Sequence, residues 1–284
     1  RVLFRSLIDV DPAFALIPEI LEKAIEHDKL DGYTPLAVVA ATGTTGSTAI
    51  DPLQPIGEIC KKHNLWLHVD AAFAGSALVL PELRWMINGI EMADSFVFNP
   101  HKWMFTNFDC SAYFVKDREA LVRTFEIMPE YLKTNEDERV NNYRDWGIPL
   151  GRRFRALKLW FVIRSYGVEG IRSIIKNHIQ MARKIEKSIE SLPDFEMLAP
   201  RPLNTLCFRY VPNGVKEIET LNRINAKLLE ELNRTGKLYL THTKLNDKYT
   251  LRFVIGQTRV TQKHVDDAWG LIVSTARNLK KDHK

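Results

Sequence analysis

The strongest constraint on the fold is a pair of short apolar segments, residues 36–41 and 65–69, joined by one amphipathic helix. Each segment is bounded by glycine or polar residues, which is typical of strands buried on both faces of a parallel sheet. Asp51 and Pro52 are suited to begin the intervening helix as N-cap and first helical residue, and Asn64 can end it. This order of strand, helix and strand predicts a right-handed βαβ unit and therefore an α/β fold.

The same kind of pattern continues along the chain. Short apolar runs predict strands at 95–98 and 111–115, and helical spacing predicts a helix over 12–29 and two more after Gly151 and Gly167. Further strands are expected at 205–210, 238–241 and 249–255, and further helices at 217–233 and 261–278. We therefore expect two parts, residues 1–157 and residues 158–284, the second being a small α/β domain with its leading connecting helix.

Polar clusters follow three of the predicted strands, at the end where open α/β sheets bind their ligands. They are residues 42–46 (TGTTG), Asp70, and residues 99–102 (NPHK). Because Asp70 and Lys102 each close a buried strand, both should project from the same edge of the sheet. This pairing suits pyridoxal 5'-phosphate (PLP), since a lysine amine can bind its aldehyde covalently and a carboxylate can keep its ring nitrogen protonated.

Taken singly, these residues have simpler interpretations. An aspartate at a strand end can cap a helix or bind a nucleotide ribose, although no GxGxxG motif precedes Asp70. A lysine after Pro-His is unremarkable by itself, and a non-catalytic α/β module is a third interpretation. His178 lies on the apolar stripe of a predicted helix, which is typical of a core or interface histidine rather than a ligand.

Four segments together resemble the group II PLP-dependent decarboxylases, and within them the aromatic-L-amino-acid decarboxylases, the group of DOPA, tyrosine and tryptophan decarboxylases. The segments are 68–76 (HVDAAFAGS), 99–103 (NPHKW), 107–111 (NFDCS) and 143–155 (YRDWGIPLGRRFR). The resemblance implies a PLP-dependent transferase-like fold (fold type I) and decarboxylation of an aromatic L-amino acid to its amine.

The resemblance begins well inside the family's large domain. It implies that residues 1–157 are the C-terminal part of the large PLP-binding domain, with its N-terminal portion absent, and that residues 158–284 are the small domain. It further implies a homodimeric active site in the full-length protein. An inactive fragment of such an enzyme is an alternative for the 284-residue chain itself.

The resemblance assigns four residues to the ring of the cofactor. Lys102 would be the lysine that binds PLP covalently, and Asp70 would pair with the ring nitrogen. Ala72 would pack its methyl group against the ring. Thr44 would lie beside the cofactor, near Asp70.

Three further positions concern the phosphate and the substrate. The resemblance implies that Asn99 and His101 lie at the phosphate end of the cofactor, with an orienting role for His101 in the lysine loop as the alternative. Histidine at position 101 also disfavours the animal histidine decarboxylases, which tend to have serine there. Gly151 lies where family members tend to have glycine or serine, and it would leave space for an indole in the substrate pocket.

Tyr131 bears on the type of reaction. It begins a long polar segment, residues 131–142, of a length that is typical of a lid. In the family that this chain resembles, a tyrosine on a mobile loop donates a proton to the substrate carbon after CO2 leaves. Members with phenylalanine at this position tend to be aldehyde synthases, so Tyr131 favours simple decarboxylation, with an aromatic aldehyde synthase as the alternative.

The composition disfavours several other classes of protein. The formal net charge is +5, but basic residues are interspersed with carboxylates and no aromatic-basic motif points to nucleic acid. No apolar run is long enough for a membrane span. The three cysteines form no CxxC pair, which favours free thiols in a reducing compartment, so we expect a cytoplasmic protein without a metal site.

Overall fold

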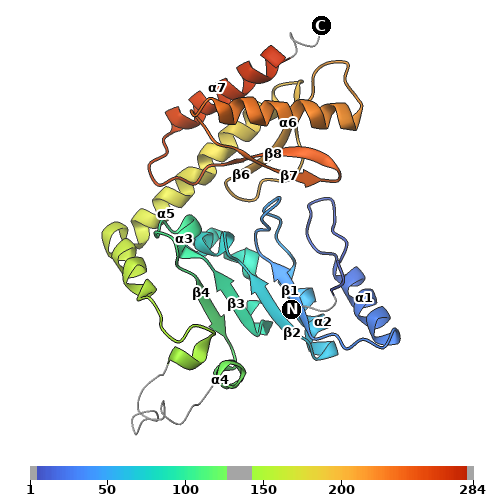
Figure 1. Ribbon diagram of the computed structural model, residues 1–284, viewed down its shortest axis with the longest axis vertical. Coiled ribbons are helices and arrows are strands. Elements are labelled where there is room, and N and C mark those ends of the chain that lie inside the picture. The colour runs from blue at the N-terminus through green and yellow to red at the C-terminus, as the bar shows by residue number, and fades with distance from the viewer. Residues whose placement is uncertain (1–4, 127–142, 280–284) are drawn as a thin grey trace.

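The computed structural model describes residues 5–126 and 143–279, and these residues form two four-stranded sheets (Figure 1). The N-terminal sheet has the order β1 (Ala37–Ala41), β2 (Trp66–Asp70), β3 (Ser95–Phe98) and β4 (Ala112–Val115). The first three strands are parallel, and β4 runs antiparallel to β3. The expected α/β fold and the four strands expected in this region are confirmed.

Two helices cover one face of the N-terminal sheet. α1 (Pro18–Leu30) and α2 (Leu53–His63) pack their apolar side chains against β1 and β2. The buried cluster consists of Leu21, Ile25, Val38, Ala40, Leu53, Ile56, Cys60, Leu65, Leu67 and Val69. Asn64 ends α2 in the left-handed conformation, with a φ of 54°, as the sequence predicts.

The opposite face of this sheet is open in the part of the chain that the structure describes. Side chains alternate along β1, so Val39 is 63% exposed although Val38 and Ala40 are buried. Asp70 pairs in register with Ala41 and lies on the open face with Val39. The expectation that β1 is buried on both faces is therefore wrong for the described residues, because the helices that pack on this sheet lie on its other face.

Short helices fill the connections around β3 and β4. They are η1 (Ala74–Val79), η2 (Pro81–Ile87), η3 (Ile90–Met92), α3 (Pro100–Trp103), α4 (Arg118–Phe125) and η5 (Tyr143–Trp146). Of these, α3 follows β3 directly and contains Lys102.

A long helix, α5 (Arg155–Glu190), runs from the N-terminal sheet to the C-terminal one (Figure 1). Gly167 interrupts it with non-helical dihedral angles (φ 65°, ψ 169°), so α5 comprises the two helices that the sequence predicts on either side of this glycine. Trp160 and Phe161 in the first half are exposed, whereas Ile171 and Ile175 in the second half are buried. None of the described helices is both long enough and apolar enough to cross a membrane.

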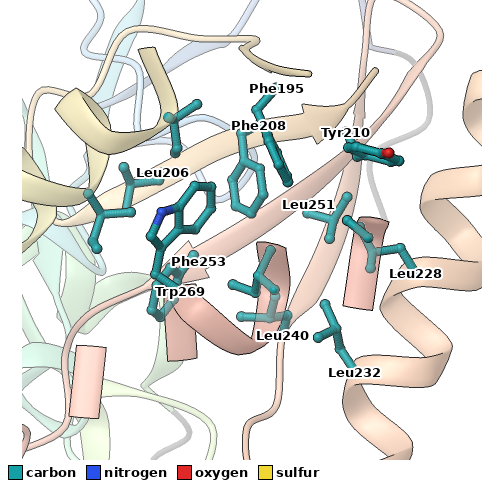
Figure 2. Packing of buried hydrophobic residues seen from close by; sticks show 14 of the residues in the cluster. Phe195, Leu206, Phe208, Tyr210, Leu228, Leu232, Leu240, Leu251, Phe253 and Trp269 are labelled. Atoms are coloured by element: carbon teal, nitrogen blue, oxygen red, sulfur yellow. The ribbon is translucent and has the colours of Figure 1, made fainter. Parts of the chain in front are cut away.

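The C-terminal sheet is antiparallel and has the order β5-β6-β8-β7. Its strands are β5 (Phe195–Met197), β6 (Thr205–Tyr210), β7 (Thr241–Leu245) and β8 (Lys248–Val254), and its helices are α6 (Ile218–Arg234) and α7 (Gln262–Leu279). Aromatic rings from β5 and β6 pack on Trp269 of α7 and on leucines of α6 (Figure 2). Together they form the largest apolar core among the described residues.

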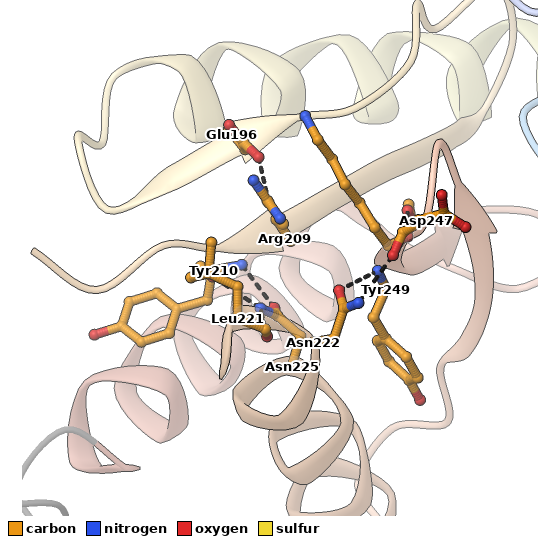
Figure 3. Close-up of polar contacts among 10 residues, drawn as sticks. Glu196, Arg209, Tyr210, Leu221, Asn222, Asn225, Asp247 and Tyr249 are labelled. Carbon is orange, nitrogen blue, oxygen red and sulfur yellow. Dashed lines mark hydrogen bonds and ion pairs between the residues drawn. The ribbon is translucent and has the colours of Figure 1, made fainter. Parts of the chain in front are cut away.

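Two asparagines of α6 fix this helix to the sheet (Figure 3). The Asn225 side chain accepts the backbone N–H of Tyr210 and donates to its carbonyl oxygen, both at 2.8 Å. Asn222 accepts the backbone N–H of Tyr249 at 2.7 Å. Because Asn225 is fully buried, its amide satisfies polar groups that would otherwise cost free energy in the core.

Some expected boundaries are wrong. The first helix begins at Pro18 rather than at residue 12, because the Asp11 carboxylate accepts two backbone N–H groups of a preceding turn. Asp51 makes no cap bond to α2. Its carboxylate instead accepts the backbone N–H groups of Leu16 and Ala41, at 2.8 and 2.7 Å. The strand expected at 238–241 is β7, which begins only at Thr241.

Candidate active site

The ends of β1, β2 and β3 meet through backbone hydrogen bonds. The Thr42 N–H, just beyond β1, donates to the Asp70 carbonyl oxygen at 2.8 Å. Beyond β3, the Asn99 N–H donates to the Ala72 carbonyl oxygen at 3.0 Å. The polar clusters that the sequence places at three strand ends are thus brought to one edge of the sheet.

Asp70 is exposed at this edge. One carboxylate oxygen accepts the Ala72 backbone N–H at 2.9 Å, which fixes the side chain in a tight turn and leaves the other oxygen available. His68, two residues earlier on the same face, lies with its Nδ1 2.8 Å from Ser95 Oγ. Burial lowers the pKa of His68, and the nearby Asp70 carboxylate opposes this shift.

Lys102 projects from the short helix α3. Asn99 precedes this helix, Pro100 occupies its first position, and the Lys102 N–H donates to the Asn99 carbonyl oxygen at 2.9 Å. The Lys102 side chain is exposed, whereas the next residue, Trp103, is fully buried. Among the described residues, the Lys102 ammonium makes no hydrogen bond or ion pair, so it remains available for a ligand.

Asn99 has a buried polar atom without a partner. Its Oδ1 makes no hydrogen bond within the described part of the chain, and the side chain does not cap α3. A buried amide oxygen of this kind is compatible with a ligand contact, because native structures satisfy nearly all such atoms. The amide can present either its oxygen or its NH2 group to a ligand.

His101 contacts the loop that follows the lysine. Its Nδ1 lies 2.7 Å from the carbonyl oxygen and 3.0 Å from the backbone nitrogen of Cys110, so it donates to the first or accepts from the second according to its tautomer. The ring lies edge-on to Phe108 at 4.9 Å between centroids. Next to Cys110, Asp109 binds Arg155 at 3.0 Å, and this guanidinium holds the pKa of the carboxyl below its usual range. These contacts join three of the segments that carry the family resemblance.

Thr44 lies in a compact loop after β1. Its Oγ1 accepts the Ala49 backbone N–H at 3.0 Å. Gly43 is required here, since its φ is 84° and a Cβ at this position would lie 2.5 Å from the Cβ of Ala74. This close approach brings the Thr44 loop against the segment that follows Asp70.

The C-terminal sheet also contacts this loop, which sequence reasoning did not predict. Arg252 Nε donates to the Gly46 carbonyl oxygen at 3.0 Å, and the Cys207 thiol lies 3.4 Å from the same oxygen. Burial raises the pKa of Cys207 to about 11, so the thiol is protonated and can donate. No local sequence pattern signals a contact between residues this far apart in the chain.

Two expected site residues are not joined to this group. Tyr131 lies outside the described residues. Gly151 is exposed, and a Cβ added there would have no heavy atom within 4 Å among the described residues. The described chain therefore brings together Thr44, Asp70, Ala72, Asn99, His101 and Lys102, but it builds no pocket wall around Gly151.

Comparison with known proteins identifies the family. Residues 3–211 match the model of the pyridoxal-dependent decarboxylase conserved domain. Tyrosine decarboxylase 2 of Arabidopsis thaliana is 44% identical over 278 residues, covering 97% of this chain and 51% of that protein. Phenylacetaldehyde synthase of the same plant is 45% identical over 273 residues, covering 95% of this chain and 56% of that protein.

Solved structures agree with this assignment. The crystal structure of Oryza sativa TDC with PLP and tryptamine matches with a TM-score of 0.91 at 36% identity, covering 94% of this chain and 56% of that one. The chain spans about half the length of the curated relatives it matches. The family model and the solved structures agree, and the chain belongs to the pyridoxal-dependent decarboxylase family.

Proposed function

We propose that the whole protein is a PLP-dependent decarboxylase that converts an aromatic L-amino acid to the corresponding amine and CO2. The observation that carries this proposal is the placement of Asp70 and Lys102 at adjacent strand ends of one sheet edge. Relatives named tyrosine and tryptophan decarboxylase support the choice of substrate class.

The residues at the sheet edge fit PLP. Lys102 offers an exposed amine that could hold the aldehyde, and Asp70 offers a carboxylate oxygen for the ring nitrogen. The buried Asn99 Oδ1 has no hydrogen-bond partner among the described residues, as expected of a group that contacts a ligand. Ala72 is small enough to lie against a flat ring.

When bound, PLP supplies an electron sink for the electrons left on the substrate as CO2 departs. The contribution of the protein is to place charges and protons. Asp70 would keep a proton on the ring nitrogen, which favours electron withdrawal. Thr44 and Ala72 would flank the ring, and Asn99 and His101 would act toward the phosphate, His101 at least by holding the loop at Cys110.

Tyr131 is the residue that we propose to separate decarboxylation from aldehyde formation. Its hydroxyl would donate a proton to the substrate carbon. Because two of the relatives are named phenylacetaldehyde synthase, an aromatic aldehyde synthase is the second candidate function. Tyr131→Phe should then shift the products from amine toward aldehyde and ammonia, with dissolved O2 as the oxidant that is reduced to peroxide.

Substrate choice is proposed to depend partly on Gly151. The described residues build no wall around Gly151, so its place in the substrate pocket rests on the family resemblance alone. We expect Gly151→Ser to reduce turnover of tryptophan more than that of tyrosine, since indole is the larger ring. Equal effects on both amino acids would remove Gly151 from the substrate pocket.

We further propose the organisation of the whole protein. Residues 1–157 would belong to the large PLP-binding domain and residues 158–284 to the small domain. The open face of the N-terminal sheet supports an additional layer in the whole protein, because parallel sheets are usually covered on both faces. We also propose that the whole protein is a homodimer in the cytoplasm.

A product assay tests the proposed function. The 284-residue chain and a version extended to the length of its relatives are each incubated with PLP and tryptophan, tyrosine or DOPA, while CO2, amine, aldehyde and peroxide are measured. Amine in equal amounts to CO2, lost in Lys102→Ala, is the expected result for the extended version. Aldehyde with peroxide would favour the second candidate, and absence of all products from the extended version would contradict both.

A further inference from the structure

Trp103, the residue after Lys102, is held from two sides. The indole is fully buried and stacks on Phe73, with 4.9 Å between ring centroids and 3° between the planes. Its Nε1–H donates to His178 Nδ1 at 3.0 Å. Phe73 directly follows Ala72, so the indole joins the helix of Lys102, to which Trp103 belongs, to the segment that follows Asp70.

His178 joins this indole to the C-terminal part of the chain. It lies on α5, is 1% exposed, and its Nε2 is 3.1 Å from the carbonyl oxygen of Gln257, which follows β8. Because Nδ1 accepts the indole N–H, Nε2 carries the ring proton and donates it to Gln257. Burial lowers the pKa of His178, which keeps the imidazole in this neutral form.

The neighbouring Gly256 adds a packing contact. A Cβ placed on Gly256 would lie 3.7 Å from Trp103 Cδ1, so the backbone before Gln257 lies against the indole. The two parts of the chain thus meet at Trp103 through a buried, hydrogen-bonded histidine and a contact with the half-buried backbone at Gly256.

The short helix α3 depends on this anchor. It has only four residues, too few to be stabilised by its own hydrogen bonds, and the Lys102 side chain has no partner among the described residues. The position of the Lys102 amine therefore depends on the backbone of α3. Trp103 fixes this backbone from the interior, and backbone hydrogen bonds of Asn99 and His101 hold it on the other side.

We propose that His178 is a positioning residue, which fixes the Lys102 amine at the cofactor site by holding Trp103. This inference rests on the proposed function in giving Lys102 its role. His178 itself does not touch the reacting atoms. Its loss would leave the buried Trp103 N–H without its acceptor, and α3 would lose one of the contacts that fix its orientation. The Gln257 carbonyl would keep a partner, because it also accepts the backbone N–H of Val260 at 3.1 Å.

Two substitutions separate the hydrogen bonds from the volume of the side chain. In His178→Gln, the amide oxygen can accept the indole N–H and the amide nitrogen can donate to Gln257. His178→Leu keeps an apolar side chain of similar size but makes neither bond. The glutamine variant should therefore restore whatever the leucine variant loses.

The first readout does not require the cofactor. The rate at which acetic anhydride labels Lys102 in the PLP-free chain is measured against pH and normalised to Lys227, an exposed lysine on α6. We expect His178→Leu to change the labelling rate of Lys102 about tenfold. Leaving the buried Trp103 N–H without an acceptor costs about as much free energy as a tenfold shift between two orientations of α3. His178→Gln should remain close to wild type.

The second readout is the visible circular dichroism of bound PLP, which reports how the cofactor is held. His178→Leu should lose this signal while His178→Gln retains it. If His178→Leu lowers only the unfolding temperature and leaves both readouts unchanged, His178 is purely structural and the proposal is overturned.

Trp103→Phe removes the donor of the hydrogen bond to His178. This variant tests the positioning role of His178 if His178→Leu does not fold. Phenylalanine can still stack on Phe73 but donates no hydrogen bond. A changed labelling rate of Lys102 supports the proposal, and an unchanged rate overturns it. If a version extended to the length of its relatives binds no PLP, the proposed function fails, but the labelling comparison still decides the role of His178.

Discussion

Replacing Gly75 by alanine probes the packing behind the candidate site. Gly75 lies in η1, where a Cβ would be 2.4 Å from the Cβ of Phe98 and 3.4 Å from that of Ala71. Phe98 ends β3 and precedes Asn99, so this contact supports the strand that leads to Lys102. A Cβ atom cannot rotate away from a clash, and so the backbone of η1 or β3 must move.

The expected cost follows from two opposing effects. Overpacking of a well-packed interior typically costs about 1–3 kcal/mol. Replacing glycine by alanine restricts the unfolded chain, which returns about 0.4–1 kcal/mol where the backbone conformation is compatible. Because the contact is with a Cβ and not with a flexible side-chain end, we expect a net loss of about 1–2 kcal/mol in the free energy of unfolding.

Urea unfolding followed by far-ultraviolet circular dichroism measures this loss. Gly270→Ala is the matched control, since Gly270 is exposed within α7 and an added Cβ would have no heavy atom within 4 Å among the described residues. The control should be more stable than wild type by about 0.5–1 kcal/mol. If Gly75→Ala is as stable as wild type, the close approach of η1 to β3 does not constrain the fold.

Three further predictions concern buried polar and titratable groups. Asp51→Ala leaves two backbone N–H groups without their acceptor and should lower the free energy of unfolding by about 2 kcal/mol, measured in urea; a change below about 0.5 kcal/mol would contradict these bonds. Burial lowers the pKa of His178 and of His68 below the ordinary 6.5, so below pH 6.5 the unfolded chain binds more protons than the folded chain. The stability that these two histidines contribute is therefore present above pH 6.5 and is lost as the pH falls below it. His178→Gln should weaken this acid dependence in thermal unfolding, and an unaltered dependence would show that His178 does not contribute. Burial raises the pKa of Cys60 and Cys207 to about 11, so Ellman's reagent should label them in urea but not in the native chain, and rapid native labelling would refute their burial.

Local sequence patterns were sufficient for the elements that carry the candidate site. The apolar runs that form β2 and β3 end at Asp70 and just before Lys102, and parallel strands bring such ends to one edge. Gly167 likewise breaks α5 where a glycine interrupts the apolar stripe. The strand ends and the break in α5 depend on residues that are close together in the chain, so the periodicity of the local sequence predicts them.

Contacts between distant residues could not be predicted in this way. Asp51 looks like a helix cap locally, but its carboxylate binds backbone 35 residues away at Leu16. The partners Trp103 and His178 are 75 residues apart, and no spacing rule pairs them. Tertiary packing decides which of several possible partners a polar side chain finds.

The predicted start of β7 was wrong, but the sequence contains a turn motif that would have placed the strand correctly. The apolar residues 238–240 favoured a strand there, but Leu240 is buried in the core and the strand begins after it. Asn246 and Asp247 both have positive φ angles, 48° and 62°, and they form the turn between β7 and β8. This dipeptide is typical of a tight hairpin turn and would have placed the strand next to it.

The most direct test of the candidate site is a visible absorption spectrum of the chain with added PLP, before and after borohydride, in wild type and Lys102→Ala. The proposed site predicts an absorbance band in wild type that borohydride abolishes, with the cofactor then found on Lys102 by peptide mapping, and no such band in Lys102→Ala. If a version extended to the length of its relatives shows no band, or carries the cofactor on another lysine, Lys102 is not the residue that binds PLP.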